Sequence, residues 1–354
     1  MENQTYMDGS TLRKLWIREA RGGILRIFIA LFVFQIISFA VVNLVAVALA
    51  IISPHLYLEL ADNAIFNILL SSGVMYLLAF PVFYLIVRRM RVRRPEKHEL
   101  KAGELIIALF AAEALMIAGN YVGVALMAIV EGIIGQPIPN GTSDLISDAP
   151  IWLLALIVVV IGPIVEELIF RKLMIDRLSV HGEFFAIIVS SVAFGIFHQN
   201  VYQLFYATLL GFLLGYVYLK CGDIKVPILI HMLMNLLGSI VALFVQEKAE
   251  TLVEILENEA YATEMPYDVT LQLYNALCAV LSYEALVYGM AIAGFVMLII
   301  GFSRKKFRLS KDCPLPLDSR GLSEATLINA GTILFLALSA IMTVMNMILP
   351  IITA

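Results

Sequence analysis

The chain has 354 residues, of which 61% are hydrophobic and 15% charged, and its mean hydropathy is +0.92. Soluble domains carry about a quarter charged residues, so this composition excludes a soluble globular protein and indicates that lipid surrounds the chain. The formal net charge is −4 and the chain has no basic patch, so nucleic acid is not expected as a partner.

Nine apolar stretches approach or exceed the length needed to cross a bilayer, and they predict an all-α, polytopic transmembrane bundle of about eight or nine spans. The stretches cover residues 24–52, 64–87, 104–134, 150–178, 184–199, 203–219, 225–246, 283–302 and 326–352. The fifth and sixth are the short ones. The first is too long for a signal peptide and lacks a clear cleavage site, so we interpret it as a retained span.

Lysine and arginine gather in alternate connecting segments. Basic segments lie at 13–21, 88–94, 171–177 and 304–308, whereas 53–63 and 135–148 contain neither residue type. Because basic segments stay in the cytoplasm, we expect a multi-pass cell-membrane protein with a cytoplasmic N-terminus. With nine spans, the C-terminus would lie outside.

Glu166 and Glu167 stand side by side in the fourth apolar stretch. Carboxylates at membrane depth are costly, and they mark a candidate functional site. Arg171 follows Glu167 by four residues on the same helical face, so we predict an ion pair between them. Glu166 points about 100° away and remains free to activate water. The alternative is a solvated charge cluster at the cytoplasmic interface.

His198 ends the fifth stretch, four residues after Phe194. If the chain turns at Gly182, then Glu166 and His198 are each sixteen residues from the turn. An antiparallel helical pair would place both side chains at one depth, roughly 20 Å from the turn. The alternative is an interfacial histidine whose hydrogen bonds are satisfied locally.

His231 and Asn235 lie four residues apart in the seventh stretch, on one helical face. Lipid cannot satisfy either side chain, so both need partners inside the protein. The pair either contributes to a polar site or joins two helices.

The three motifs read Glu-Glu-x-x-x-Arg, Phe-x-x-x-His and His-x-x-x-Asn, in that order, on separate apolar stretches. This set resembles the CAAX-protease and bacteriocin-processing family (CPBP, or Abi), whose members are intramembrane endopeptidases. The resemblance covers about residues 150–240. It implies that Glu167 and Arg171 shape the site, which agrees with the ion pair predicted above.

The resemblance also implies roles for the other motif residues. Glu166 would be the base that activates the attacking water, and His198 would hold that water or a metal ion. His231 and Asn235 would stabilise the oxyanion of the tetrahedral intermediate. Glu166, His198 and His231 form a chemically adequate zinc set. However, the chain contains no His-Glu-x-x-His, and Asn235 is a poor zinc ligand. We expect a reaction without metal, with zinc as the alternative cofactor and a metalloprotease as the alternative class.

We therefore divide the chain into N-terminal spans (1–149), a catalytic core (150–246), and an acidic external segment followed by the C-terminal spans (247–354). The predicted function is hydrolysis of a peptide bond in a membrane-associated peptide or protein tail, lipidated tails included. The alternatives are a transporter or channel, which internal repeats would favour, and a non-enzymatic immunity or interaction protein. No internal repeat is evident.

Two further patterns carry structural expectations. The acidic segment 247–282 has apolar residues at helical intervals, which predicts an amphipathic helix on the outer surface. The three cysteines, Cys221, Cys278 and Cys313, show no disulfide or metal-binding spacing, so we interpret them as small packing residues or free thiols.

Overall fold

The structure, a computed structural model, describes residues 9–138, 140, 149–258, 261, 265–310, 312–315 and 317–353. Over these residues it contains helices and no β-strand, which confirms the all-α prediction. Eight of the described helices are long and apolar enough to cross a membrane, and a ninth apolar helix, Glu183–Phe197, is shorter. This agrees with the predicted eight or nine spans.

The first part of the chain forms three spans and one short connecting helix, α2. Their helices are α1 (Gly9–Ile52), α2 (Pro54–Ala61), α3 (Ala64–Gly73), the π-helical turn η1 (Val74–Ala79), α4 (Phe80–Val87) and α5 (Ala102–Ile134). The fourth span consists of α7 (Ile151–Leu154), η2 (Ala155–Ile161), α8 (Gly162–Glu167), η3 (Leu168–Ile175), α9 (Asp176–Leu178) and η4 (Ser179–His181). The remaining helices are α10 (Glu183–Phe197), α11 (Val201–Cys221), α12 (Lys225–Asn235), η5 (Leu236–Val241), α13 (Ala242–Glu257), α14 (Tyr267–Ser303), α15 (Ser319–Leu327) and α16 (Ala330–Thr353).

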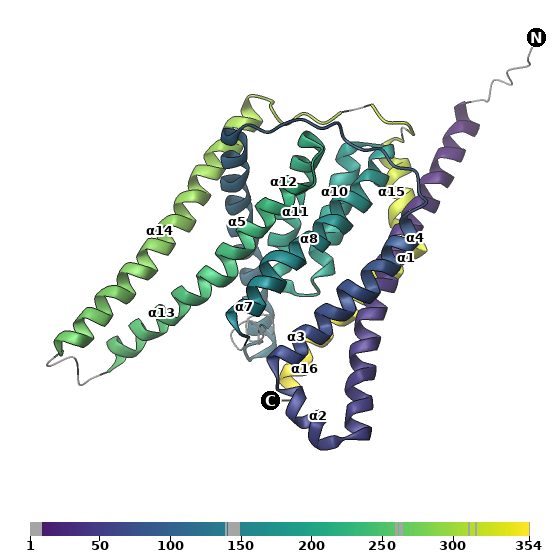
Figure 1. Ribbon diagram of the computed structural model, residues 1–354. Coiled ribbons are helices and arrows are strands. Elements are labelled where there is room, and N and C mark those ends of the chain that lie inside the picture. Colours follow the sequence, from purple (N-terminus) through teal and green to yellow (C-terminus); the bar gives the residue numbers. More distant parts are fainter. Residues whose placement is uncertain are drawn as a thin grey trace, which may run out of the picture.

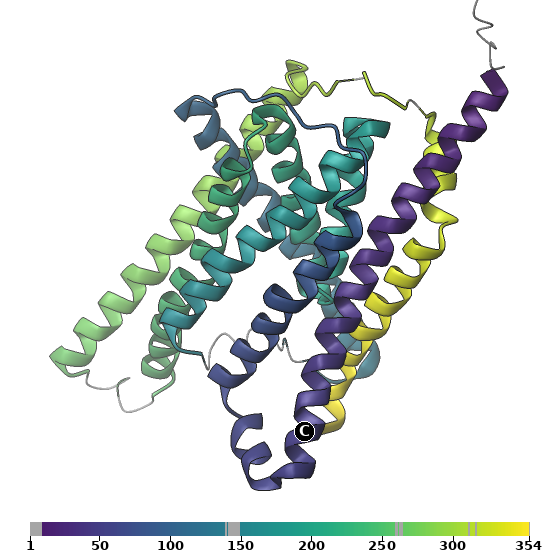
Figure 2. The ribbon, with the colours of Figure 1, turned by 45° about the vertical axis from the view of Figure 1, so that its right-hand side comes forward.

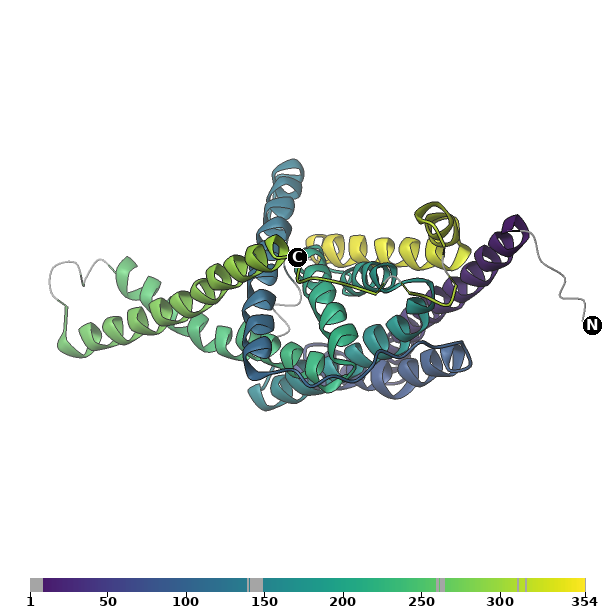
Figure 3. The ribbon, with the colours of Figure 1, turned by 90° about the horizontal axis from the view of Figure 1, so that it is seen from above.

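The helices at the centre of the bundle are those of the motif region, with flanking spans on both sides (Figure 1). α11 packs against α5 and α10, while α5 also packs against α14. On the other side, α1 packs along α4 and α16, so the first and last spans lie side by side (Figure 2). In Figure 3, viewed from above, α13 and α14 extend from one end of an elongated assembly and α1 extends from the other.

The contact between α1 and α16 includes a buried polar pair. The amide Nε2 of Gln35 donates to the hydroxyl of Ser339 at 2.9 Å, and that hydroxyl lies 3.2 Å from Gln35 Oε1. Both side chains are buried. Because lipid offers no hydrogen-bond partners, such a pair fixes the register of two spans that are 304 residues apart in sequence.

The acidic segment 247–282 does not form a separate surface helix, so that prediction was wrong. Its first part extends α13 and its second part begins α14, and these two helices pack side by side. Ile255 on α13 is buried, as are Val269 and Ala276 on α14. Of the apolar positions that suggested a membrane-surface helix, Ile255 faces protein and Leu256 is exposed, and both lie on a helix that continues from the preceding span.

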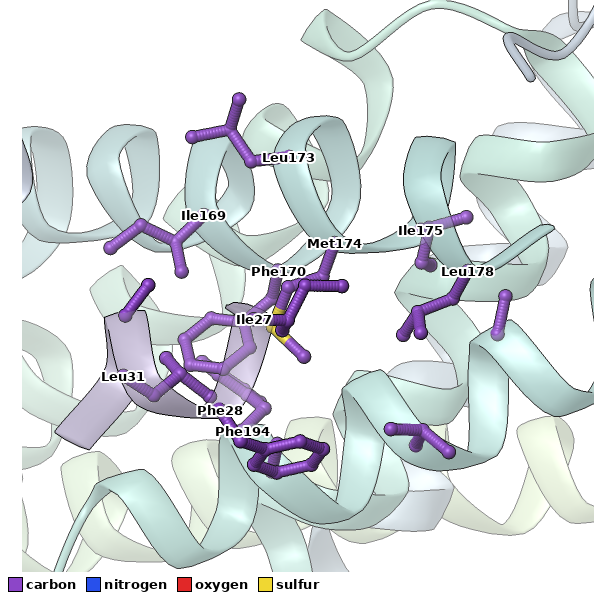
Figure 4. Close-up of a cluster of buried hydrophobic side chains, with 14 of the residues drawn as sticks. Ile27, Phe28, Leu31, Ile169, Phe170, Leu173, Met174, Ile175, Leu178 and Phe194 are labelled. Carbon is purple, nitrogen blue, oxygen red and sulfur yellow. The ribbon is translucent and has the colours of Figure 1, made fainter. Parts of the chain in front are cut away.

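Large apolar side chains hold the motif hairpin against the first span. Ile27, Phe28 and Leu31 of α1 meet Phe170 of η3 and Phe194 of α10 in one cluster (Figure 4). The ring centroids of Phe170 and Phe194 are 5.0 Å apart, and the ring planes meet at 65° in an edge-on contact. Close packing of this kind stabilises helix association in lipid, where apolar burial alone gives no advantage. The cluster therefore fixes η3 relative to α10, and with them the two motifs that they carry.

Two connecting segments lie against the last turn of the fourth span, just before α10. The backbone N–H of Arg93 donates to Asp176 O at 2.6 Å, and the N–H of Leu315 donates to Val180 O at 3.0 Å. Both segments lie at the same end of the molecule, the upper end in Figure 1. They tie this turn to the flanking spans and bring the basic stretches 88–94 and 304–308 to one end.

Candidate active site

A cavity of about 300 Å³ lies among the membrane-spanning helices, and the motif residues face it. Glu166, His198, His231 and Asn235 all line its wall. The register of the hairpin predicts one depth for Glu166 and His198, and both side chains reach this same space. Four polar motif residues from three apolar helices are thus brought together.

Glu167 and Arg171 lie behind the cavity wall as a fully buried ion pair. Arg171 Nε is 2.9 Å from Glu167 Oε2, and Arg171 Nη2 donates to Oε1 at 3.2 Å. Neither side chain has exposed surface. The shorter contact is not aligned as a hydrogen bond, so the Nη2 contact is the directional one. The predicted pairing is confirmed, and it separates a structural glutamate from the cavity-facing Glu166.

Arg171 is held by two further contacts. Its Nη1 lies 3.4 Å from the hydroxyl of Ser190, which itself donates to Phe170 O at 2.7 Å. Its guanidinium carbon lies 4.9 Å from the centre of the Phe194 ring. Phe194, the first residue of the Phe-x-x-x-His motif, therefore shields the ion pair and supports it by a cation–π contact.

His231 joins the two glutamates. Its Nδ1 lies 3.1 Å from Glu167 Oε1, and its Nε2 lies 3.7 Å from Glu166 Oε2. A carboxylate paired with arginine accepts hydrogen bonds, so Nδ1 carries a proton that it donates to Glu167. In the neutral ring, Nε2 then presents a lone pair on the side of Glu166.

In His198, as in His231, Nδ1 is the ring nitrogen that carries the proton. Its Nδ1 lies 2.8 Å from the carbonyl oxygen of Phe194, which can only accept, so Nδ1 is the donor. The Nε2 of the neutral ring is therefore an acceptor. With the carboxylate of Glu166 and Nε2 of His231, it makes three proton acceptors in the wall of one cavity. Such a set suits a water molecule, which has two hydrogens to donate.

Asn235 is positioned by a break in the fourth span. Its Nδ2 donates to Val158 O at 2.9 Å. In the π-helical turn η2, the N–H of Gly162 bonds to Ile157 O, five residues earlier. With the same five-residue spacing, the N–H of residue 163 would bond to Val158 O. Residue 163 is a proline, Pro163, which has no N–H. Pro163 thus frees the carbonyl of Val158, and Asn235 satisfies it while retaining one amide hydrogen.

Two tyrosines in the cavity wall were missed by the sequence analysis. Tyr76 comes from η1 and Tyr206 from α11. Tyrosine is common in membrane spans, but it concentrates at the two interfaces, where its hydroxyl reaches water. Tyr76 stands near the middle of the span Ala64–Val87. A mid-span tyrosine is therefore the signal that could have identified it.

The arrangement does not assemble a zinc site. Over the described part of the chain, no group of three or more His, Cys, Asp or Glu side chains lies close enough to hold a metal ion. Zinc needs ligand atoms at about 2.0–2.2 Å from one centre. One nitrogen of His231 is taken up by Glu167, and the other lies 3.7 Å from Glu166. The ligand types are suitable, but the described residues do not gather them as such a group.

The helical bundle encloses a cavity lined by glutamate and histidine, and the comparisons with known proteins identify a membrane protease. Residues 148–237 match the family described as type II CAAX prenyl endopeptidase Rce1-like. The chain is 32% identical over 178 residues to the putative membrane peptidase YdiL of Bacillus subtilis. This match covers 48% of the chain and 71% of the relative. It is 31% identical over 176 residues to the membrane-embedded CAAX protease MroQ of Staphylococcus aureus, covering 46% and 69% respectively.

A weaker relative is the UPF0177 protein YxdF of Lactococcus lactis, which is 28% identical over 145 residues, 40% of this chain and 81% of the relative. No solved structure matches the chain significantly. The chain belongs to the CPBP family of CAAX-type membrane proteases, as its three motifs predict. The family match coincides with the segment that carries all three motifs.

Proposed function

We propose that the protein hydrolyses a peptide bond in a membrane-associated tail, with a water molecule activated by Glu166. The observation that carries this proposal is the set of three acceptors in one cavity. A water that donates one hydrogen to Glu166 and the other to His198 Nε2 keeps a lone pair free for a carbonyl carbon.

In the proposed reaction, Glu166 takes up one proton from the water and later releases it to the leaving group. As the water oxygen attacks the carbonyl carbon, Glu166 accepts its proton and a tetrahedral oxyanion forms. As the oxyanion collapses and the C–N bond breaks, Glu166 passes that proton to the leaving nitrogen. Asn235 has one free amide hydrogen for the oxyanion, and His231 donates from Nε2 when its ring carries a second proton. No step requires a metal.

Glu167 and Arg171 act through His231 in this proposal. Their ion pair fixes the acceptor for the His231 Nδ1 proton, which sets the direction of Nε2. They position the ring and do not touch the substrate. Residues 150–246 thus carry the chemistry, with support from the spans on either side.

We propose a CAAX tail as the substrate, because one relative is named as a CAAX protease and the matching family as a prenyl endopeptidase. Such a tail carries a prenylated cysteine followed by three residues. The basic end of the bundle would face the cytoplasm, where the N-terminus would also lie. Labelling Cys313, which lies in the segment after α14, with a membrane-impermeant reagent in inverted and right-side-out vesicles would test this orientation.

The test of function uses two internally quenched peptides that end in Cys-aliphatic-aliphatic-Met, one farnesylated and one not. Purified wild type should cleave at least one, whereas Glu166→Gln and His198→Gln should lose at least ~100-fold in kcat, as expected for a lost acid–base group. Glu59→Gln and His55→Gln are matched controls, since both residues are exposed on α2. Full activity in Glu166→Gln would overturn the assignment.

A further inference from the structure

Tyr76 reaches the active-site cavity from outside the family-matched segment. It lies in η1 of the second span, and its side chain lines the cavity with Glu166 and His198. The family match covers only residues 148–237. Its hydroxyl has no hydrogen-bond partner among the residues that the structure describes. The phenol therefore offers an uncommitted O–H donor in a largely apolar space.

Gly162 shows how close this phenol comes to the proposed base. A methyl group placed at Gly162 would lie 3.3 Å from the Tyr76 hydroxyl oxygen and 4.0 Å from Glu166 Oε1. Both oxygens thus border the same small volume, which is open because residue 162 has no side chain. The π-helical turn η2 ends at Ile161, directly before Gly162, and such turns are frequent at functional sites.

The motif residues offer few hydrogen-bond donors for the oxyanion of the proposed reaction. The Nδ1 proton of His198 is donated to Phe194 O, and that of His231 to Glu167. In the neutral form of either ring, the remaining nitrogen, Nε2, can only accept. Asn235 donates one amide hydrogen to Val158 O, and its second amide hydrogen remains available. A tetrahedral oxyanion commonly receives two or more donors, and each is worth a large factor in rate. The motif residues alone supply one donor without a further protonation.

We propose that the O–H of Tyr76 is an additional oxyanion donor, which makes Tyr76 a catalytic residue supplied by the second span. This inference rests on the proposed function. The phenol donates to the carbonyl oxygen of the substrate, and the bond shortens and strengthens as negative charge develops on that oxygen. Tyr76 completes with Asn235 the pair of donors that the cavity needs while His231 is neutral.

The first experiment measures steady-state cleavage of the quenched CAAX peptides by Tyr76→Phe. We expect kcat to fall by about 10²–10³-fold with KM little changed, as for loss of an oxyanion donor. Tyr84→Phe is the matched control, because Tyr84 is exposed on α4 in the same span. Thermal unfolding of both variants should match wild type, which separates lost chemistry from lost folding.

A second experiment separates oxyanion donation from a structural role. A peptide trifluoromethyl ketone, which forms a tetrahedral adduct with water, should bind Tyr76→Phe more weakly than wild type. The matching uncleaved substrate peptide, measured with Glu166→Gln in the background, should bind equally with or without the phenol. Equal weakening of both ligands would assign Tyr76 to general shaping of the cavity and would overturn the proposal.

The outcomes distinguish this inference from the function on which it rests. If Glu166→Gln is inactive but Tyr76→Phe cleaves within about twofold of wild type, only the role of Tyr76 falls. If wild type cleaves neither peptide, the proposed function falls and the Tyr76 role falls with it. Selective loss in Tyr206→Phe, with Tyr76→Phe unaffected, would place the donor on α11 and contradict the proposal.

Discussion

His231 and Glu167 are joined by a buried contact of 3.1 Å between Nδ1 and Oε1, and this contact links the ion pair to the cavity. Glu167 accepts from both His231 and Arg171, so three side chains from two separate motifs form one network. The network fixes which nitrogen of His231 faces Glu166. The two glutamates of the motif thus have different surroundings, because adjacent residues on a helix face different directions.

Removal of Glu167 should harm stability as well as activity. Glu167→Ala leaves the buried guanidinium of Arg171 without its counter-ion, and loss of one partner of a buried pair typically costs about 3–5 kcal/mol. Thermal unfolding in detergent should show a large decrease in Tm. The double variant Glu167→Leu/Arg171→Met should recover part of that loss, since it leaves no buried charge unpaired. Normal stability in Glu167→Ala would contradict the pairing.

The link between Pro163 and Asn235 predicts a compensating pair of substitutions. Asn235→Leu leaves the carbonyl of Val158 unsatisfied inside the bundle, at a cost of about 1–3 kcal/mol. Adding Pro163→Ala restores an N–H that can bond to that carbonyl, so the double variant should be more stable than Asn235→Leu alone. Unfolding in a denaturant series measures the difference. If Pro163→Ala gives no recovery, the carbonyl is not freed by the proline.

Gly195 should be intolerant of a side chain, because it lies where α10 meets α11. A Cβ atom there would fall 2.0 Å from Thr208 Oγ1 and 2.5 Å from Leu204 O. Gly195→Ala must push the helices apart just before His198, at a cost of about 1–3 kcal/mol and with a loss of activity. Gly289→Ala is the control, since nothing lies within 4 Å of its added methyl. Similar Tm values for the two variants would argue against the close helix contact.

Metal removal should leave the reaction intact. Because Glu166 and the acceptor nitrogens of His198 and His231 can hold and activate a water by themselves, we expect cleavage of the CAAX peptides to persist after dialysis against a chelator. Elemental analysis of the active, purified protein should find far less than one zinc per chain. Stoichiometric zinc, together with loss of activity on chelation and its return on adding zinc, would establish the metalloprotease alternative.

The sequence alone was sufficient for the class of protein and for much of the site. Long apolar stretches can satisfy their backbone in lipid only as helices, so the all-α bundle followed from composition and periodicity. The pairing of Glu167 with Arg171 followed from the four-residue spacing, because local helix geometry fixes which side chains share a face. The order of the three motifs was enough to indicate the family.

The tertiary structure alone decided the contacts between distant segments. Helical periodicity predicted an amphipathic surface helix in 247–282, but it could not show that α13 and α14 pack side by side and bury Ile255, Val269 and Ala276. It also could not place Tyr76 beside Glu166, because the two residues lie on different spans. Spacing along a chain fixes geometry within one helix, whereas the approach of two helices depends on packing, glycine contacts and buried polar pairs contributed by both.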